Sequence, residues 1–146
     1  MHIVVVGSLN MDLVIQMPQI PKPGETLLGG VFKNFPGGKG ANQAVAAARL
    51  GAHVSMIGCV GDDAFGKELR AGLENDGVDT THVLVHPEAA TGVALIQVDV
   101  QGQNSIAVAS GANFCLISAD VEKAMQTIGE FDALLMQLET PLETIY

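Results

Sequence analysis

The chain has 146 residues, a length typical of one domain, and 48% of them are hydrophobic, which is enough to bury a sizeable core. Its net charge is −9 and its seven Lys and Arg residues are not clustered, which argues against a nucleic-acid partner. No apolar run approaches the ~20 residues needed to span a bilayer, and the N-terminus lacks a secretory signal, so we expect a cytoplasmic protein without membrane contact.

The first third of the chain predicts one buried strand, two weaker strands and a helix. Residues 2–7, HIVVVG, form a β-branched run closed by glycine, which is typical of a central parallel strand. Shorter strands are expected at 11–21 and 25–35, on either side of the turn sequence PKPGE. Small apolar residues at helical spacing predict a helix over 38–51, with Gly51 as its stop.

The rest of the chain continues with a buried strand, a helix, three strand-like runs, a helix and a final buried strand. Their expected ranges are 53–61, 62–77, 81–86, 91–100, 104–110, 118–129 and 132–138. Asp62 or Asp63 is predicted to cap the helix over 62–77, and Gly77 to end it. Two distant cysteines, Cys59 and Cys115, indicate buried free thiols instead of a disulfide framework.

Strands that alternate with helices predict an α/β fold with a parallel sheet flanked by helices. The extra strand-like runs do not fit this alternation, so we expect them to form a small separate sheet at one edge. Near the end, Thr140, Pro141 and Glu143 match the N-cap, N1 and N3 positions of a capping box. Because the chain stops about one turn later, we expect it to be the front part of a longer protein.

Three polar clusters are expected at the carboxyl ends of the parallel strands, where α/β sheets bind their ligands. Asn10 and Asp12 follow the first strand, Lys39 and Asn42 stand in the glycine-rich start of a helix, and Glu139 follows the last strand. These side chains are directional hydrogen-bonding groups without a metal-ligand pattern. Such a set suits a sugar, whose hydroxyl groups both donate and accept.

Each cluster also has a purely structural interpretation. Asn10 and Asp12 could satisfy their own backbone in a turn, the glycines could permit a tight loop, and Glu139 could favour a helix dipole. A phosphate-binding P-loop is not matched, because Lys39 is followed by Gly40 where a Ser or Thr is required. The expectation of one shared site therefore depends on the proposed strand order.

The stretch GGKGANQAVAAARLGA, residues 37–52, resembles the N-terminal signature of the ribokinase or PfkB-type family of sugar kinases. GSLNMD, PKPGET, GCVGDDAFG, TGVALI and LLMQLETPLE look like segments of the same family in the same order, so the resemblance spans essentially the whole chain. It implies a Rossmann-like α/β domain with a small β-sheet lid that closes over the sugar and often mediates dimerisation. The extra strands at about 13–35 and 81–109 would form that lid.

The resemblance also implies the residues that hold the sugar. The implied hydroxyl contacts are Asn10, Asp12, the backbone of Gly38, Lys39, Asn42 and Glu139, and the implied apolar lid contacts are Ala94 and Val108. The implied reaction is transfer of the ATP γ-phosphoryl group to the 5-hydroxyl of D-ribose, giving ribose 5-phosphate, with Mg²⁺ and a monovalent cation such as K⁺.

The phosphoryl-donor machinery of that family lies in its C-terminal half. Its catalytic aspartate stands in a Gly-Ala-Gly-Asp motif, and neither that motif nor the nucleotide and cation sites occur in this sequence. We therefore expect this chain to supply the sugar site and the lid, to be inactive alone, and to form homo-oligomers through the lid or an exposed sheet edge. The alternatives are a non-catalytic sugar-binding or self-associating half-domain, or a kinase for deoxyribose, fructose or a nucleoside.

Overall fold

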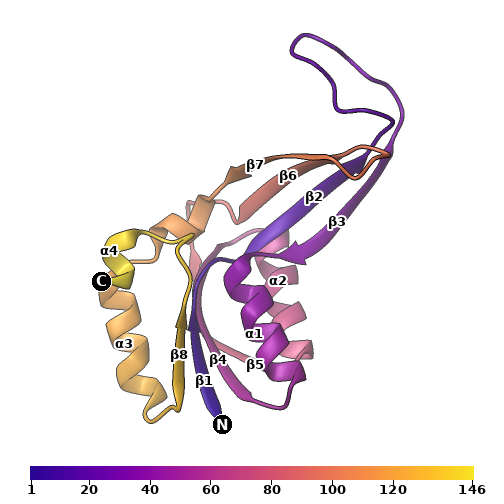
Figure 1. Ribbon diagram of the computed structural model, residues 1–146. Helices are drawn as coiled ribbons and strands as arrows, with labels where there is room; N and C mark the ends of the chain where they lie inside the picture. Colours follow the sequence, from indigo (N-terminus) through magenta and orange to yellow (C-terminus); the bar gives the residue numbers. More distant parts are fainter.

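The computed structural model describes residues 1–146, which fold into two sheets and the helices around them (Figure 1). The main sheet has the strand order β5-β4-β1-β8, and all of its strand pairs are parallel. Its strands are β1 (His2–Val6), β4 (His53–Gly61), β5 (Val78–His86) and β8 (Ala133–Met136). The predicted α/β fold with a parallel sheet is confirmed.

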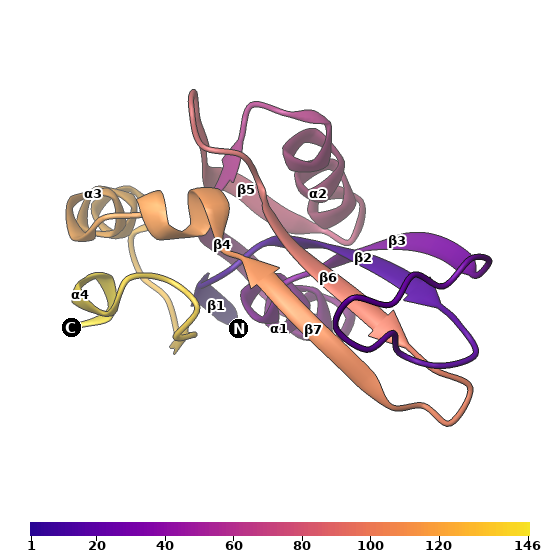
Figure 2. The same cartoon turned by 90° about the horizontal axis from the view of Figure 1, so that it is seen from above.

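Helices cover both faces of the main sheet (Figures 1 and 2). One face carries α1 (Lys39–Arg49) and α2 (Ala64–Asn75), and the other carries α3 (Ser118–Ile128). A short 3-10 helix, η1 (Gly111–Cys115), precedes α3, and α4 (Leu142–Ile145) follows β8. No helix combines the length and the apolar character that crossing a membrane requires.

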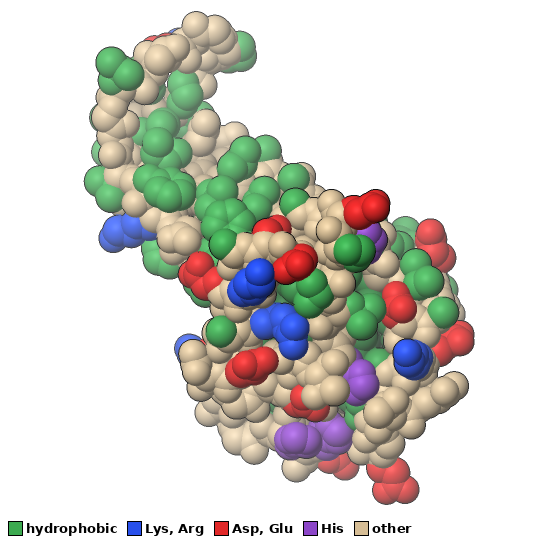
Figure 3. All heavy atoms as spheres, turned by 180° about the vertical axis from the view of Figure 1, so that it is seen from behind, with side chains coloured by type: hydrophobic (Ala, Val, Ile, Leu, Met, Phe, Trp, Pro, Cys, Tyr) green, Lys and Arg blue, Asp and Glu red, His purple; other side chains and the backbone are tan.

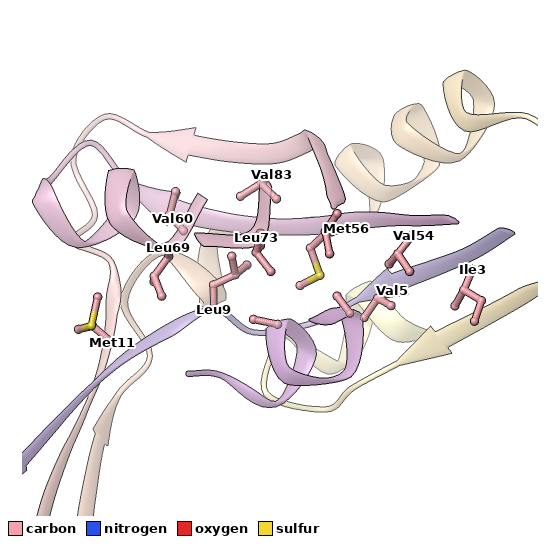
Figure 4. Packing of buried hydrophobic residues seen from close by; sticks show 13 residues of the cluster. Ile3, Val5, Leu9, Met11, Val54, Met56, Val60, Leu69, Leu73 and Val83 are labelled. Carbon is pink, nitrogen blue, oxygen red and sulfur yellow. The ribbon is translucent and has the colours of Figure 1, made fainter. Parts of the chain in front are cut away.

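The alternating side chains of β1 divide the core into two layers. Ile3 and Val5 pack with residues of α1 and α2, in the cluster that Figure 4 shows. Val4 and Val6 pack on the opposite side, in a cluster that includes Cys59 and residues of α3. Burial raises the pKa of the Cys59 thiol to about 11, with smaller contributions from Cys115 and Asp120.

The second sheet projects from the main body as an arm (Figure 1). Its order is β3-β2-β6-β7, with β2 and β6 parallel and the two outer pairs antiparallel. The strands are β2 (Asn10–Gln16), β3 (Val31–Gly37), β6 (Gly92–Val98) and β7 (Asn104–Ala109). The residues between β2 and β3 form the long loop at the tip of the arm.

Two of the predictions about elements need correction. The range 81–109 expected for the small sheet begins too early, because β5 pairs in parallel with β4 as the edge of the main sheet. The capping box at Thr140 is wrong: Pro141 is the N-cap of α4 and no side chain caps it. The Thr140 side chain is buried and its hydroxyl donates to the Gln137 carbonyl at 3.4 Å, so it is not available to the helix.

The predicted helix boundaries agree with the structure at three glycines and one aspartate. Gly51 and Gly77 lie just after the C-caps of α1 and α2 with φ of 91° and 80°, a conformation that glycine adopts readily. Asp63, one of the two predicted caps, accepts a hydrogen bond from the Gly66 N–H. Gly129 follows α3 with φ of 78°.

Candidate functional site

A hollow of about 240 Å³ lies where the carboxyl ends of β1 and β8 meet the base of the small sheet. We refer to it as the Glu139 hollow; its lining residues are Asn10, Val108, Ser110, Asn113, Phe114, Leu138 and Glu139. Three residues predicted from the sequence, Asn10, Val108 and Glu139, therefore line one hollow although they are far apart in the chain.

Strand register places further predicted residues on the same face of the small sheet. Asp12 is paired with Ala94, and Ala94 with Val108, so the three form one row across β2, β6 and β7. Directly paired residues share a face, and Asn10 joins them because it precedes Asp12 by two positions. This face combines polar groups at its base with apolar groups beyond them.

Glu139 is the centre of a small polar network. Its Oε1 accepts from the Lys39 ammonium at 2.6 Å, and its Oε2 accepts from the Ser8 hydroxyl at 2.9 Å. Ser8 is held in turn by Gln137, whose Oε1 accepts from the Ser8 N–H at 3.2 Å. Burial acts to raise the pKa of Glu139, but the hydrogen bonds from Lys39 and Ser8 outweigh it and hold the pKa below its usual value. Glu139 is therefore a fixed carboxylate.

Asp12 lies in a different environment. Its carboxylate has no hydrogen bond or ion pair within the chain, so its oxygen atoms are free to accept from a ligand. Burial and, to a smaller degree, the negative charge of Glu139 raise the pKa of Asp12. A ligand that donates hydrogen bonds to this carboxylate would relieve both effects.

The glycine-rich loop makes room for the chain's own backbone. Gly38 has φ of 95°, and a Cβ placed there would lie 2.6 Å from the Ser8 carbonyl oxygen. A Cβ on Gly40 would lie 2.6 Å from the Gly7 carbonyl carbon. These glycines let the start of α1 pack against the connection between β1 and β2, which brings Lys39 to Glu139. The glycines therefore serve the tight loop that was one interpretation of the sequence, and the atoms they approach belong to the protein itself.

Several predicted residues do not line the Glu139 hollow, namely Asp12, Gly38, Lys39, Asn42 and Ala94. Of these, Asn42 is the one that faces a different groove. It is exposed on α1 and lines a separate groove of about 280 Å³ between α1 and α2. Its backbone N–H donates to the Gly38 carbonyl at 2.9 Å, as an N-terminal residue of the helix should. The sugar contact expected of Asn42 stays a prediction.

Sequence reasoning missed Ser8, Gln137 and Asn113. Ser8 and Gln137 flank residues that were predicted, but their hydrogen bonds are made to other protein groups. Asn113 is buried in η1 and bonds to Leu9 and Asn10. Only its polar character within the mostly apolar stretch GANFCL distinguished it in the sequence.

No group of three or more His, Cys, Asp and Glu side chains is arranged to hold a metal ion.

The chain matches a family model described as pfkB family carbohydrate kinase over residues 1–143. It is 50% identical over 141 residues to a ribokinase of Haemophilus influenzae, covering 97% of this chain and 46% of the relative. It is 44% identical over 146 residues to a deoxyribokinase of Salmonella typhimurium, covering 100% of this chain and 48% of the relative.

Solved structures agree with this match. The structure of Arabidopsis thaliana ribokinase complexed with ribose and ATP superimposes with a TM-score of 0.78 at 31% identity, covering 97% of this chain and 48% of that one. The chain thus spans about half the length of the relatives it matches.

Proposed function

The chain belongs to the PfkB family of carbohydrate kinases, and we propose that it supplies the sugar-binding part and the lid of an ATP-dependent sugar kinase. The proposed acceptor is D-ribose, phosphorylated on its 5-hydroxyl to ribose 5-phosphate. The relatives named ribokinase support this acceptor, and the Arabidopsis complex with ribose and ATP supports ATP as the phosphoryl donor. We also propose that the protein acts in the cytoplasm.

The observation that carries the proposal is the meeting of polar groups from distant segments beneath an apolar row of the small sheet. A sugar has hydroxyl groups at its rim and apolar C–H groups on its faces, and this arrangement is complementary to both. The rim would contact Asn10, Asp12, Lys39, Glu139 and the backbone of Gly38, and the ring would contact Ala94 and Val108.

The chain's own residues would bind the sugar and exclude water from it. Asp12 accepts from a hydroxyl group, while Lys39 donates to one and keeps Glu139 ionised. Closure of the small sheet would cover the ring and reduce competition from water. Residues outside this chain would hold ATP and Mg²⁺. ATP would supply the phosphoryl group, and Mg²⁺ would neutralise its negative charge.

Calorimetric titration of the chain with ribose tests the proposal. Asp12→Asn is expected to weaken binding about 10-fold to 100-fold, because a hydrogen bond to a charged group contributes about 1.5–3 kcal/mol. Glu122→Gln removes the same charge from an exposed position on α3 and serves as the matched control. Equal ribose affinity in the two variants would contradict the assignment.

A deoxyribose acceptor is the second candidate, because a deoxyribokinase is among the similar relatives. A site that pairs with the 2-hydroxyl rejects the deoxy analogue by up to about 10⁴-fold, whereas a deoxyribose site accepts both sugars. Titration with 2-deoxyribose beside ribose separates these cases. Fructose and a nucleoside complete the panel, since related kinases act on them as well.

A non-catalytic half-domain that binds sugar or self-associates is the alternative from another class. Transfer depends on positioning and on electrostatic stabilisation of the phosphoryl group, so we propose that the 146-residue chain has negligible kinase activity by itself. Ribose-dependent ATP consumption by the isolated chain in a coupled assay would contradict this. Ribose binding without turnover fits both the kinase part and the half-domain.

A further inference from the structure

Asn113 is a buried side chain whose three hydrogen bonds all go to Leu9 and Asn10, in the segment after β1. It stands in η1 and is only 1% exposed. Its Oδ1 accepts from the Leu9 N–H at 2.8 Å, while its Nδ2 donates to the Leu9 carbonyl at 3.0 Å and to Asn10 Oδ1 at 2.8 Å. The residue thus connects a backbone group to the side chain of Asn10.

The polarity of these bonds is fixed by the backbone. The Leu9 N–H can only donate, so the Asn113 atom that faces it must be the oxygen. The nitrogen of Asn113 then faces the Leu9 carbonyl and Asn10, and since an amide nitrogen can only donate, Asn10 must present its oxygen. The Asn10 amide therefore has one orientation, with its NH₂ group on the other side.

The NH₂ group of Asn10 has no partner within the chain. The Asn10 nitrogen is also accessible to solvent. Arg70 Nε is the one side-chain nitrogen or oxygen that is fully buried and has no hydrogen-bond partner, so the unpartnered Asn10 nitrogen is not fully buried. Asn10 lines the Glu139 hollow, so this free donor is available to a ligand there. Gly92 makes the contact between the two amides possible, since a Cβ at that position would overlap both Asn10 Oδ1 and Asn113 Nδ2.

We propose that Asn113 is a positioning residue that fixes the amide of Asn10 as a hydrogen-bond donor toward the ligand. The proposal rests on the proposed function in one respect, namely that the ligand is a sugar. Asn10 and Asp12 lie on the same face of β2, one offering a donor and the other an acceptor. A hydroxyl group that accepts from Asn10 and donates to Asp12 satisfies both, and an amide turned the other way would offer two acceptors instead.

The orientation is tested without any sugar by NMR of the side-chain amides. In the unmodified chain, the NH₂ protons of Asn113 are expected to exchange slowly with water, because both are donated to buried acceptors, and those of Asn10 rapidly. Asn10→Asp assigns the Asn10 signal by its loss. Slow exchange of the Asn10 protons and rapid exchange of the Asn113 protons would overturn the proposal.

Asn113→Asp replaces the NH₂ group that donates to Asn10 with an oxygen that can only accept, and the shape of the side chain hardly changes. The new carboxylate still accepts from the Leu9 N–H but can donate neither to the Leu9 carbonyl nor to Asn10. The Asn10 amide is therefore expected to turn its NH₂ group inward. Exchange of the Asn10 protons should then slow at least 10-fold. An unchanged Asn10 exchange rate in a folded variant would contradict the proposed control by Asn113.

Ribose titration supplies the second readout. Asn113→Asp is expected to weaken ribose binding about 10-fold to 100-fold, because the ligand hydroxyl meets an acceptor where it needs a donor. Thr80→Val removes a buried hydroxyl on β5, away from the hollow, and controls for loss of stability. Equal affinity in Asn113→Asp and the unmodified chain would overturn the proposal. Absence of ribose binding in the unmodified chain would contradict the proposed function, while amide exchange still decides the orientation.

Discussion

Asp12 and Glu139 are close enough to interact electrostatically, yet folding shifts the pKa values of their carboxyl groups in opposite directions. Glu139 is held as an anion by Lys39 and Ser8, so both of its oxygens already have a donor. Asp12 has no donor and is disfavoured as an anion by burial and by Glu139. The pair thus combines a carboxylate that is neutralised by donors within the chain with one that has no such donor.

This difference predicts that Asp12 destabilises the folded chain at neutral pH. A carboxyl group whose pKa rises on folding disfavours the folded state above that pKa and has no effect below its unfolded value, near 3.8. Asp12→Asn is therefore expected to unfold at a higher temperature than the unmodified chain at pH 7, although it binds ribose more weakly. The difference in unfolding temperature should vanish as the pH falls below about 3.8, and equal stability at pH 7 would contradict the prediction.

At the residue scale, a side chain could be predicted from the sequence when its role depends on nearby residues, and could not when its role depends on a distant contact. The convergence of Asn10, Asp12 and Glu139 could be predicted, because each follows a strand of the parallel sheet and the carboxyl ends of such strands meet at one edge. Asn113 acts on Asn10 from a position 103 residues away, and no local pattern reveals such a pair. For Gly38, a tight loop could be predicted from the glycine content, but the sequence did not show that its close neighbour is the backbone of Ser8, Leu9 and Asn10.

At the scale of elements, Asp63 joins the start of α2 to the segment that enters the small sheet. Its Oδ1 accepts from the Gly66 N–H and from the Thr91 hydroxyl, and its Oδ2 accepts from the Thr91 N–H. Burial acts to raise the pKa of Asp63, but the hydrogen bonds from Thr91 and Gly66 outweigh it and the pKa is lowered. One carboxylate thus serves as a helix cap and as a link between the two sheets.

Asp63→Ala is expected to lower the free energy of unfolding by about 2 kcal/mol at pH 7, because both a cap and buried donors lose their acceptor. Asp62→Ala is the matched control and should change it by less than about 1 kcal/mol, since Asp62 forms only an exposed pair with Lys67. A lowered carboxyl pKa contributes stability above the unfolded value, and this contribution is lost as the pH falls through the folded value. Urea unfolding of both variants at pH 7 and pH 3 should therefore show the gap between them closing in acid.

Two helical glycines predict opposite effects of the same substitution. Gly40 lies against Gly7 and Ser8, whereas nothing lies within 4 Å of a Cβ placed on Gly72. Gly72→Ala is expected to raise the free energy of unfolding by about 0.5–1 kcal/mol through the unfolded state. Gly40→Ala should lower it by about 1–3 kcal/mol, because backbone atoms must move apart. Similar effects of the two substitutions on urea unfolding would show that α1 is not tightly packed on the β1–β2 connection.

Strands and helices were predicted well where the local pattern of side chains determines them. They were predicted less well where strand pairing with distant segments determines their position. The buried strands and the glycine-terminated helices follow from local periodicity and backbone preference. The placement of β5 could not be read this way, because 81–86 is a short apolar run between polar residues, and such a run suits either sheet. Its place depends on α2, which returns the chain to the edge of β4.

At the scale of the whole molecule, large apolar side chains are exposed along the arm (Figure 3). On the face opposite Asp12, Phe32 and Leu95 are 62% and 53% exposed, and register places them with Leu13 and Ile15. The base of this face packs on α2, but nothing in the chain covers its outer part. We propose that a second copy covers it, in line with the expected homo-oligomer.

Phe32→Glu is expected to convert the oligomer to a monomer, because it places a charge in the apolar outer part of this face. Leu135→Glu on the open edge strand β8 is the control, and should leave the mass unchanged if association uses the arm. Light scattering across a concentration series measures both. A monomeric unmodified chain at all concentrations would contradict self-association, and dissociation only by Leu135→Glu would assign it to the β8 edge.

Because Cys59 is deeply buried, Cys115 is the one thiol that a reagent can reach in the native chain. A thiol with a pKa of about 11 stays protonated and shielded at neutral pH, whereas Cys115 is partly exposed at the end of η1. A thiol reagent should therefore modify one group per native chain and two after denaturation. A fluorophore attached there would sit two positions from Asn113 in the chain, and its emission offers a test of the proposed closure of the arm without any engineered cysteine.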